Sequence, residues 1–210
     1  MPSFKVLDHA DPRPWHLQEL LKSNGRWRVI VFPGRIAEAR NKQQFEKPGE
    51  SLGTPDSFSR WFTPQGKPID SVIEVLTVHS GPRTSVELLD LPEAFHPYHG
   101  DMGWDYWKFY SDEESYHERN AHAYDSYRIN LSRGTRVILR PDQYVNWVRE
   151  VDDYDQMSQF FAGFMKNKRR KARRSEVMLQ PNLHCDITYT SVIPFNSGNK
   201  SNGLWRNFVL

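Results

Sequence analysis

Residues 26–32 (RWRVIVF) constrain the fold of this chain more than any other segment. Branched and aromatic side chains favour a strand, and Pro33-Gly34 ends it. The run Val29–Phe32 is apolar at consecutive positions, so we expect both sides of the strand to be buried. A strand buried on both sides lies inside a sheet that helices cover. The segment therefore predicts an α/β protein with this strand near the centre of its sheet.

The rest of the chain supplies further strands and helices in an order that fits one layered domain. Apolar and β-branched runs predict four more strands, at 69–79, 106–110, 135–139 and 143–148, the last two joined by a turn at 140–142. Helical spacing predicts short helices within 15–21, 35–44, 56–62, 117–127 and 153–165, with Asp11 and Asp152 as N-caps, a break at 47–49 and a loop at 95–105. This order predicts an α/β sandwich with a central mixed sheet flanked by helices. The thioredoxin fold has this order, and several other small α/β folds compete with it.

The last predicted helix sets the expected domain boundary. Met157, Phe160, Phe161 and Phe164 are spaced at i, i+3, i+4 and i+7, which places them in one apolar stripe. We expect this stripe to close the core. The domain is therefore predicted to span residues 5–166.

The segment that follows differs in charge from the body. Residues 166–210 contain nine Lys and Arg against two acidic residues, and seven of the nine lie within 166–174. Such runs are usually solvated, so we expect 167–210 to be a poorly ordered basic tail, with a nuclear-localisation signal as the alternative. Because the body itself is mildly acidic, we expect no nucleic-acid partner.

Cysteine content and hydropathy limit the class of protein further. Cys185 is the only cysteine, which excludes an internal disulfide framework and any site built from several cysteines. No apolar stretch approaches 18 residues, and the first residues lack the apolar region of a secretory signal. We therefore expect a cytoplasmic chain without a membrane partner.

Redox and metal chemistry are both poorly supported. A thioredoxin-type redox site needs a thiolate just after the first central strand, where this chain reads PGRI at 33–36. A metal site could be assembled from imidazole and carboxylate groups in and after the 95–105 loop, namely His96, His99, Asp101, His117 and His122. Their spacing matches no known metal signature. We expect hydrogen-bonded or surface histidines instead.

The sequence gives equally weak support for a hydrolase site and for an anion-binding site. Ser80, His79 and either Asp70 or Asp90 would supply the residue types of a triad, yet there is no Gly-x-Ser-x-Gly motif. Residues 83–84, which follow a Gly-Pro pair, could bind an anion through turn donors. A simple turn explains both segments.

A cluster of aromatic residues is the most informative remaining feature of the sequence. Trp104, Tyr106, Trp107, Phe109 and Tyr110 lie within seven positions. In a strand over 106–110, alternate side chains face opposite sides, and one side must be core. Aromatic side chains on an exposed side would suit a protein–protein surface, and helices over both sides would bury them instead.

Much of the chain resembles a known protein family. Four long collinear segments are similar to the C-terminal domain of fungal phenol 2-monooxygenases, which are FAD-dependent aromatic hydroxylases: 10–34, 70–94, 103–117 and 138–150. The resemblance covers about residues 5–166. It implies a thioredoxin-like domain that serves subunit association, next to separate FAD-binding and substrate domains.

The resemblance implies that this chain, on its own, is not the seat of flavin chemistry. The sequence has no Gly-x-Gly-x-x-Gly after a strand. We therefore assign no catalytic, cofactor-binding or metal-binding residue, and expect FAD only in the parent flavoprotein. The hypothesis is a non-catalytic dimerisation domain of an aromatic monooxygenase, an oxidoreductase of aromatic compound metabolism, present without its other domains. Its partners would be a second copy or the flavoprotein domains.

A second hypothesis comes from a different class of protein. The chain could be a free-standing small enzyme or ligand-binding protein of a secondary-metabolite pathway. This alternative expects an enclosed pocket lined by several aromatic residues with one or two polar anchors.

Overall fold

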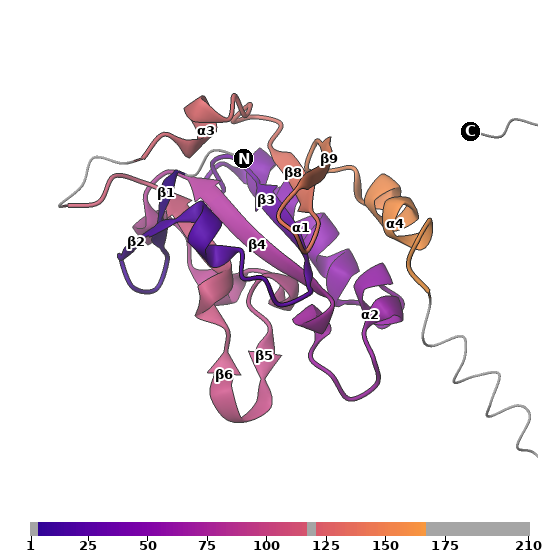
Figure 1. The fold of residues 1–210 in the computed structure, drawn as a ribbon. Coiled ribbons are helices and arrows are strands. Elements are labelled where there is room, and N and C mark those ends of the chain that lie inside the picture. Colours follow the sequence, from indigo (N-terminus) through magenta and orange to yellow (C-terminus); the bar gives the residue numbers. More distant parts are fainter. Residues whose placement is uncertain (1–3, 117–120, 167–210) are drawn as a thin grey trace, which may run out of the picture.

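The computed structural model describes residues 4–116 and 121–166 and centres on one mixed sheet. The sheet has seven strands in the order β2-β1-β7-β4-β3-β8-β9 (Figure 1). Their bounds are β1 Lys5–Asp8, β2 Pro14–His16, β3 Trp27–Phe32, β4 Ile73–Ser80, β7 Phe109–Asp112, β8 Thr135–Leu139 and β9 Val145–Arg149. The strand predicted from 26–32 is β3, and it is flanked by β4 and β8.

The directions of the strands confirm the predicted class. β3 runs parallel to β4, with Val29 opposite Val75, and β4 runs parallel to β7. β8 is antiparallel to β3 and forms a hairpin with β9. The structure is thus an α/β sandwich around a mixed sheet, thioredoxin-like in the order of its elements.

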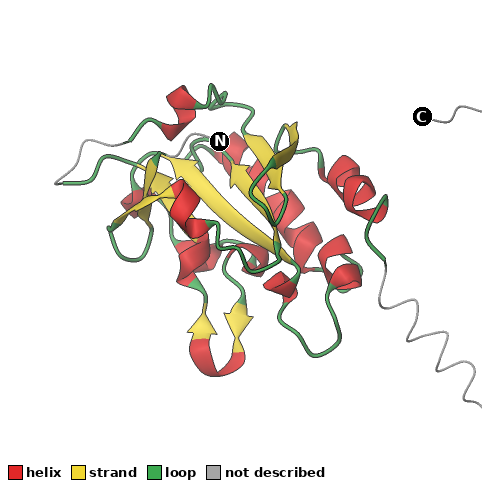
Figure 2. Cartoon of the chain, viewed as in Figure 1, coloured by secondary structure: helices red, strands yellow, loops and turns green. Residues whose placement is uncertain are grey.

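The longer helices pack on one side of the sheet (Figure 2). They are α1 Ala39–Gly53, α2 Phe58–Phe62 and α4 Tyr154–Ala162. Ser57 caps α2 by accepting a hydrogen bond from the Arg60 backbone N–H. The core on this side joins residues of all three helices to Val29 and Val31 of β3.

The other side of the sheet has a thinner cover. It consists of the 3-10 helix η1 Leu17–Leu20 and the one-turn helix α3 Ala123–Ser126. Ile30 and Phe32 of β3 pack on this side with Tyr124. α3 begins where it does because the Asp112 carboxylate accepts the backbone N–H groups of residues 122–124 at 2.9–3.0 Å.

Short elements connect the strands and build a second, two-stranded sheet. β5 Tyr98–His99 and β6 Gly103–Trp104 pair as a small hairpin. The remaining 3-10 helices are η2 Ile69–Ser71, η3 Arg83–Ser85, η4 Leu88–Asp90, η5 Glu93–Phe95, η6 Gly100–Met102 and η7 Tyr106–Lys108.

The predicted break at 47–49 is wrong, because α1 continues through Pro48. Proline inside a helix removes one backbone hydrogen bond and costs about 3 kcal/mol. Packing offsets this cost: Phe45 stacks on Phe95 with ring centroids 3.9 Å apart, and Pro48 and Leu52 are buried. Gly49 allows the close approach, since a Cβ there would lie 2.3 Å from the Phe95 ring.

Several other boundaries differ from the expectations. The predicted helix over 15–21 is a strand followed by η1, because residue 15 pairs with Val6 of β1, a strand that the pattern did not reveal. The predicted strand 69–79 begins only at Ile73, and the predicted strand 106–110 begins only at Phe109. The 95–105 loop contains the β5–β6 hairpin.

Two predicted helix starts also need correction. α4 begins at Tyr154 with Asp153 at its N-cap position, where no side-chain hydrogen bond forms, so Asp152 is not the cap. Asp11 caps no helix, since a strand follows it. In the predicted helix 117–127, residues 117–120 lie outside the described residues, and only Ala123–Ser126 is helical.

Candidate association surface

A short arm, residues 97–105, projects from the body of the molecule (Figure 1). Its two strands pair Tyr98 with Trp104, and η6 forms the tip. The backbone N–H of Asp105 donates to the Pro97 carbonyl at 3.0 Å and closes the base of the arm. Gly103 has a φ of 77°, a conformation that other residues rarely adopt, so the glycine allows the tip to turn.

Large apolar side chains are exposed on and beside the arm, and we call them the aromatic arm surface. Its members, with exposed fractions, are Tyr98 (54%), Met102 (85%), Trp104 (37%), Tyr106 (37%) and Trp107 (53%). Contiguous exposed apolar patches on a soluble protein often mark interaction sites. The surface is partly ordered by its own contacts, because the rings of Trp104 and Tyr98 meet edge to face at 5.1 Å.

The structure divides the predicted aromatic cluster between this surface and the core. Phe109 and Tyr110 are buried in β7, whereas residues 104, 106 and 107 are exposed. The expected strand alternation over 106–110 is wrong, because Tyr106–Lys108 is a 3-10 helix. Trp107 packs edge to face on Trp15 at 5.7 Å, which fixes η7 to β2.

A cluster of buried charges lies under the arm, and we call it the ionic base. At its centre is Lys108, whose Nζ lies 3.3 Å from Oδ2 of Asp70 and from Oδ2 of Asp105 and also contacts Glu74. Arg26 and Arg28 complete the cluster from the β3 side, 3.0 Å from Asp70 and Glu74 respectively.

The ionic base is electrically balanced. Three carboxylates face three cationic side chains, and all but Arg26 are largely buried. Burial by itself would lower the pKa of Lys108, but the carboxylates of Glu74, Asp105 and Asp70 outweigh it and raise that pKa. Lys108 is therefore charged at neutral pH and ties the arm to β4.

The ionic base also contains His99, one of the residues weighed for a metal site. Asp70, His99 and Asp105 present ligand atoms within 4.8 Å of one another. The Lys108 ammonium already contacts Oδ2 of both carboxylates, so the cationic position is taken by a side chain. His99 contributes from the arm, with Nε2 3.5 Å from Asp105.

The other residues weighed for a metal site do not join His99. His96 is buried and its Nε2 bonds to the Leu91 carbonyl at 2.8 Å. His122 is exposed beside α3. Asp101 is exposed at the arm tip, and His117 lies outside the described residues.

The position of a thioredoxin-type thiol is closed by packing. The Gly34 backbone N–H donates to the Tyr124 hydroxyl at 2.8 Å, and that hydroxyl donates to the Val78 carbonyl at 2.8 Å. Burial raises the pKa of Tyr124, so the hydroxyl remains a donor. Cys185 lies outside the described residues.

The residues weighed for a hydrolase triad are not brought together. His79 is fully buried near the end of β4, stacked on Phe109 at 5.3 Å, and burial lowers its pKa to about 4. Asp70 lies before the opposite end of β4, in the ionic base. The Ser80 backbone N–H is bonded to the Gly34 carbonyl at 2.9 Å.

The turn considered for anion binding is also paired within the chain. The Arg83 backbone N–H donates to Oε2 of Glu113 at 2.8 Å. A carboxylate of the protein therefore already accepts the donor that an anion would use.

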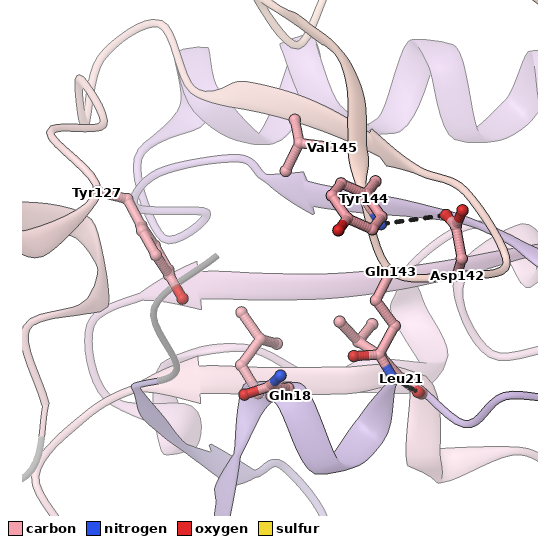
Figure 3. A pocket seen from close by; sticks show the side chains of 8 residues that line it. Gln18, Leu21, Tyr127, Asp142, Gln143, Tyr144 and Val145 are labelled. Carbon is pink, nitrogen blue, oxygen red and sulfur yellow. Dashed lines mark hydrogen bonds between the residues drawn. The ribbon is translucent and has the colours of Figure 1, made fainter.

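A hollow of about 480 Å³ opens on the thinly covered side of the sheet (Figure 3). Its lining residues are Leu17, Gln18, Leu21, Tyr127, Asp142, Gln143, Tyr144 and Val145. Tyr127 and Tyr144 lie on opposite sides of it, and Gln143 lies beside Leu21 and donates to the Leu21 carbonyl at 2.7 Å. Tyr144 is 71% exposed, so the hollow is open to solvent and differs from the enclosed aromatic pocket of the alternative hypothesis.

No helix among the described residues is long and apolar enough to cross a membrane.

Comparison with protein families gives a match over most of the chain. The model described as "Phenol hydroxylase, C-terminal dimerisation domain" matches residues 1–169. Among curated proteins, the chain is 33% identical over 169 residues to phenol 2-monooxygenase fsqG of Aspergillus fumigatus, covering 80% of this chain and 27% of that protein. It is 35% identical over 169 residues to the FAD-dependent monooxygenase terD of Aspergillus terreus, covering 80% of this chain and 28% of that protein.

A bacterial protein matches over a similar part. The chain is 30% identical over 167 residues to 3-hydroxybenzoate 4-monooxygenase of Comamonas testosteroni, covering 78% of this chain and 26% of that protein. The chain thus spans about a quarter of the length of the curated relatives it matches.

Solved structures with related architecture are more distant. Yeast Sco1 aligns with a TM-score of 0.44 and 13% identity over 79% of this chain and 96% of that chain. The lipoprotein thioredoxin Etrx1 of Streptococcus pneumoniae aligns with a TM-score of 0.37 and 12% identity over 75% of this chain and 98% of that chain.

Proposed function

The chain belongs to the family of phenol hydroxylase C-terminal dimerisation domains, and we propose that it is a non-catalytic association domain of an FAD-dependent aromatic monooxygenase. Its role is to hold protein subunits or domains together. The flavin and the aromatic substrate are bound by the polypeptide that makes up the rest of the relatives' length.

The aromatic arm surface is the observation that carries this proposal. Met102 is 85% exposed at the tip of the projecting hairpin, and four aromatic side chains are exposed along the hairpin and on η7 beside it. Tyr and Trp are enriched where proteins associate, because they bury a large area at low entropic cost. A surface of this kind on a supported arm suits a lasting contact with another protein surface.

The polar groups of the described residues support a structural role. The ionic base is closed by Lys108, and the Gly34 turn is closed by Tyr124. His79 is buried against Phe109 and lies apart from the carboxylates that could orient it. In the described ranges 4–116 and 121–166, Asp70 and Lys108 are thus paired and His79 is enclosed by packing, whereas Asp101 and His122 are exposed.

Two measurements on the purified chain test the proposal. We expect no flavin absorbance after incubation with FAD and gel filtration, because binding is assigned to the other domains. We also expect a self-associated species in sedimentation velocity. A near-stoichiometric flavin spectrum in the eluted protein would contradict the non-catalytic assignment.

The hollow supports a second candidate, a small-ligand-binding role. Its volume of about 480 Å³ falls within the range of roughly 300–1,000 Å³ typical of ligand pockets. Tyr127 and Tyr144 supply aromatic lining, and Gln18 and Gln143 supply amide groups to it. Equilibrium dialysis with simple phenols tests this role. Binding that Tyr144→Ala abolishes would favour it over the association role.

A further inference from the structure

We propose that the aromatic arm surface is the contact between two copies of this chain, with the arm of each copy packed against the arm of the other about a twofold axis. This inference rests on the proposed association function and goes beyond it by naming the surface and the partner. In a twofold contact the same residues lie on both sides, so the surface must be compatible with itself.

The charge of the arm meets that requirement. Residues 97–107, all of which the structure describes, contain three ionisable acids or histidines. His99 and Asp105 point into the ionic base, where they pair with each other at 3.5 Å. Asp101 alone among them is exposed. An identical surface therefore brings only one exposed carboxylate per copy to the contact, so repulsion between like charges is small.

The size of the hairpin gives a second reason for a partner. β5 and β6 are two residues long each, so the hairpin offers little apolar area of its own to cover its side chains. Tyr98, Met102 and Trp104 remain exposed to different degrees. A second arm would cover these side chains with apolar groups of the same kind.

The arm is also held firmly enough to act as a docking element. Its base is closed by the Asp105–Pro97 backbone hydrogen bond and by Lys108. The ring of Trp104 packs edge to face on buried His96 at 5.1 Å. A preorganised surface loses little conformational entropy when it binds, which favours association.

A second copy is the partner favoured by the family match. The matching model describes a dimerisation domain, which is a contact between like chains. The surface carries no charge pattern that would select an oppositely charged partner. A contact between the arm and a different polypeptide, such as a flavoprotein domain, is an outcome that the test below separates.

The test uses the full chain and two matched substitutions. Met102→Glu places a charge within the aromatic arm surface, at the tip of the arm, and Tyr144→Glu places the same charge at the hollow. Both side chains are highly exposed, at 85% and 71%, so neither change disturbs the core. Circular dichroism melting confirms that each variant is folded.

Sedimentation velocity over a concentration series then gives the result. We expect the wild-type chain and Tyr144→Glu to be dimeric, and Met102→Glu to be monomeric with an unchanged melting temperature. Dimers of folded Met102→Glu would overturn the arm contact while leaving the association function intact. A wild-type chain that is monomeric at every concentration would overturn both.

Discussion

Two peripheral elements are fastened to the same sheet by opposite means. Helix α4 is held by aromatic rings: Phe161 is fully buried, stacked on Phe58 at 5.3 Å and packed against Trp27 at 5.8 Å. The arm is held by the ionic base, where Lys108 joins it to the carboxylates near β4. One attachment depends on shape and apolar area, and the other depends on charge balance.

The difference predicts how each attachment responds to change. Apolar packing tolerates shifts in pH and salt, and it weakens in proportion to the volume removed. A buried ionic cluster adds little net stability when complete, but removal of one partner leaves an uncompensated buried charge. The ionic base therefore specifies where the arm lies more than it adds to the free energy of unfolding.

Phe161→Ala should produce the largest effect. Loss of a fully buried phenylalanine costs about 3–5 kcal/mol, a large part of the roughly 5–15 kcal/mol of a typical domain. Chemical denaturation should show a midpoint shift of that size at both low and high salt. A loss that varied strongly with salt would break the distinction between the two attachments.

Lys108→Met should produce the second-largest loss of stability. The substitution keeps the length of the side chain but leaves three carboxylates facing two arginines, so we expect a loss toward the lower end of about 3–5 kcal/mol. The matched control is Lys42→Met, because Lys42 forms an exposed pair with Glu46 at 3.6 Å. That pair contributes about 0–1 kcal/mol. Equal denaturation midpoints for the two variants would show that the ionic base does not stabilise the fold.

Acid should destabilise the protein through His79, and this effect must be separated from the ionic base. Burial lowers the pKa of His79 from 6.5 to about 4. The unfolded chain therefore binds a proton more readily, so the stability is fully present above pH 6.5 and is lost as the pH falls toward 4. His79→Gln should make the denaturation midpoint depend less on pH over this range. If the midpoint of the variant falls with pH as steeply as that of the wild type, groups other than His79 cause the acid sensitivity.

Phe164→Ala should have a smaller effect than Phe161→Ala. Phe164 is 48% exposed and its main ring contact is with Trp27 at 4.9 Å. An aromatic pair of this kind contributes about 1 kcal/mol. Denaturation of both variants under one set of conditions tests whether burial, and not position in the stripe, decides the cost.

Truncation after Lys166 should have the smallest effect. α4 ends at Ala162, and its apolar stripe is complete before the cut. We expect the free energy of unfolding to change by less than about 0.5 kcal/mol, as for surface changes generally. A fall comparable to that of Phe161→Ala would show that residues 167–210 add to the attachment of α4, and that the predicted boundary at 166 is too early.

The sequence revealed the parts of the fold whose signals are local. The apolar run of β3 and the hairpin of β8 and β9 are visible in short windows, because each depends on alternation or on a turn. The stripe of α4 is visible for the same reason, and Met157 and Phe161 are indeed buried. The long family-like segments gave the family, which the match over residues 1–169 confirms.

The tertiary structure alone decided the arm and its attachment. Lys108 meets Asp70 and Glu74 across more than thirty residues of chain, and no periodic pattern links such positions. The passage of α1 through Pro48 likewise depends on Phe95, which lies far along the sequence. Local patterns report how a segment pairs with its neighbours, whereas buried ion pairs and compensated helix breaks depend on which distant residues the sheet register brings into contact.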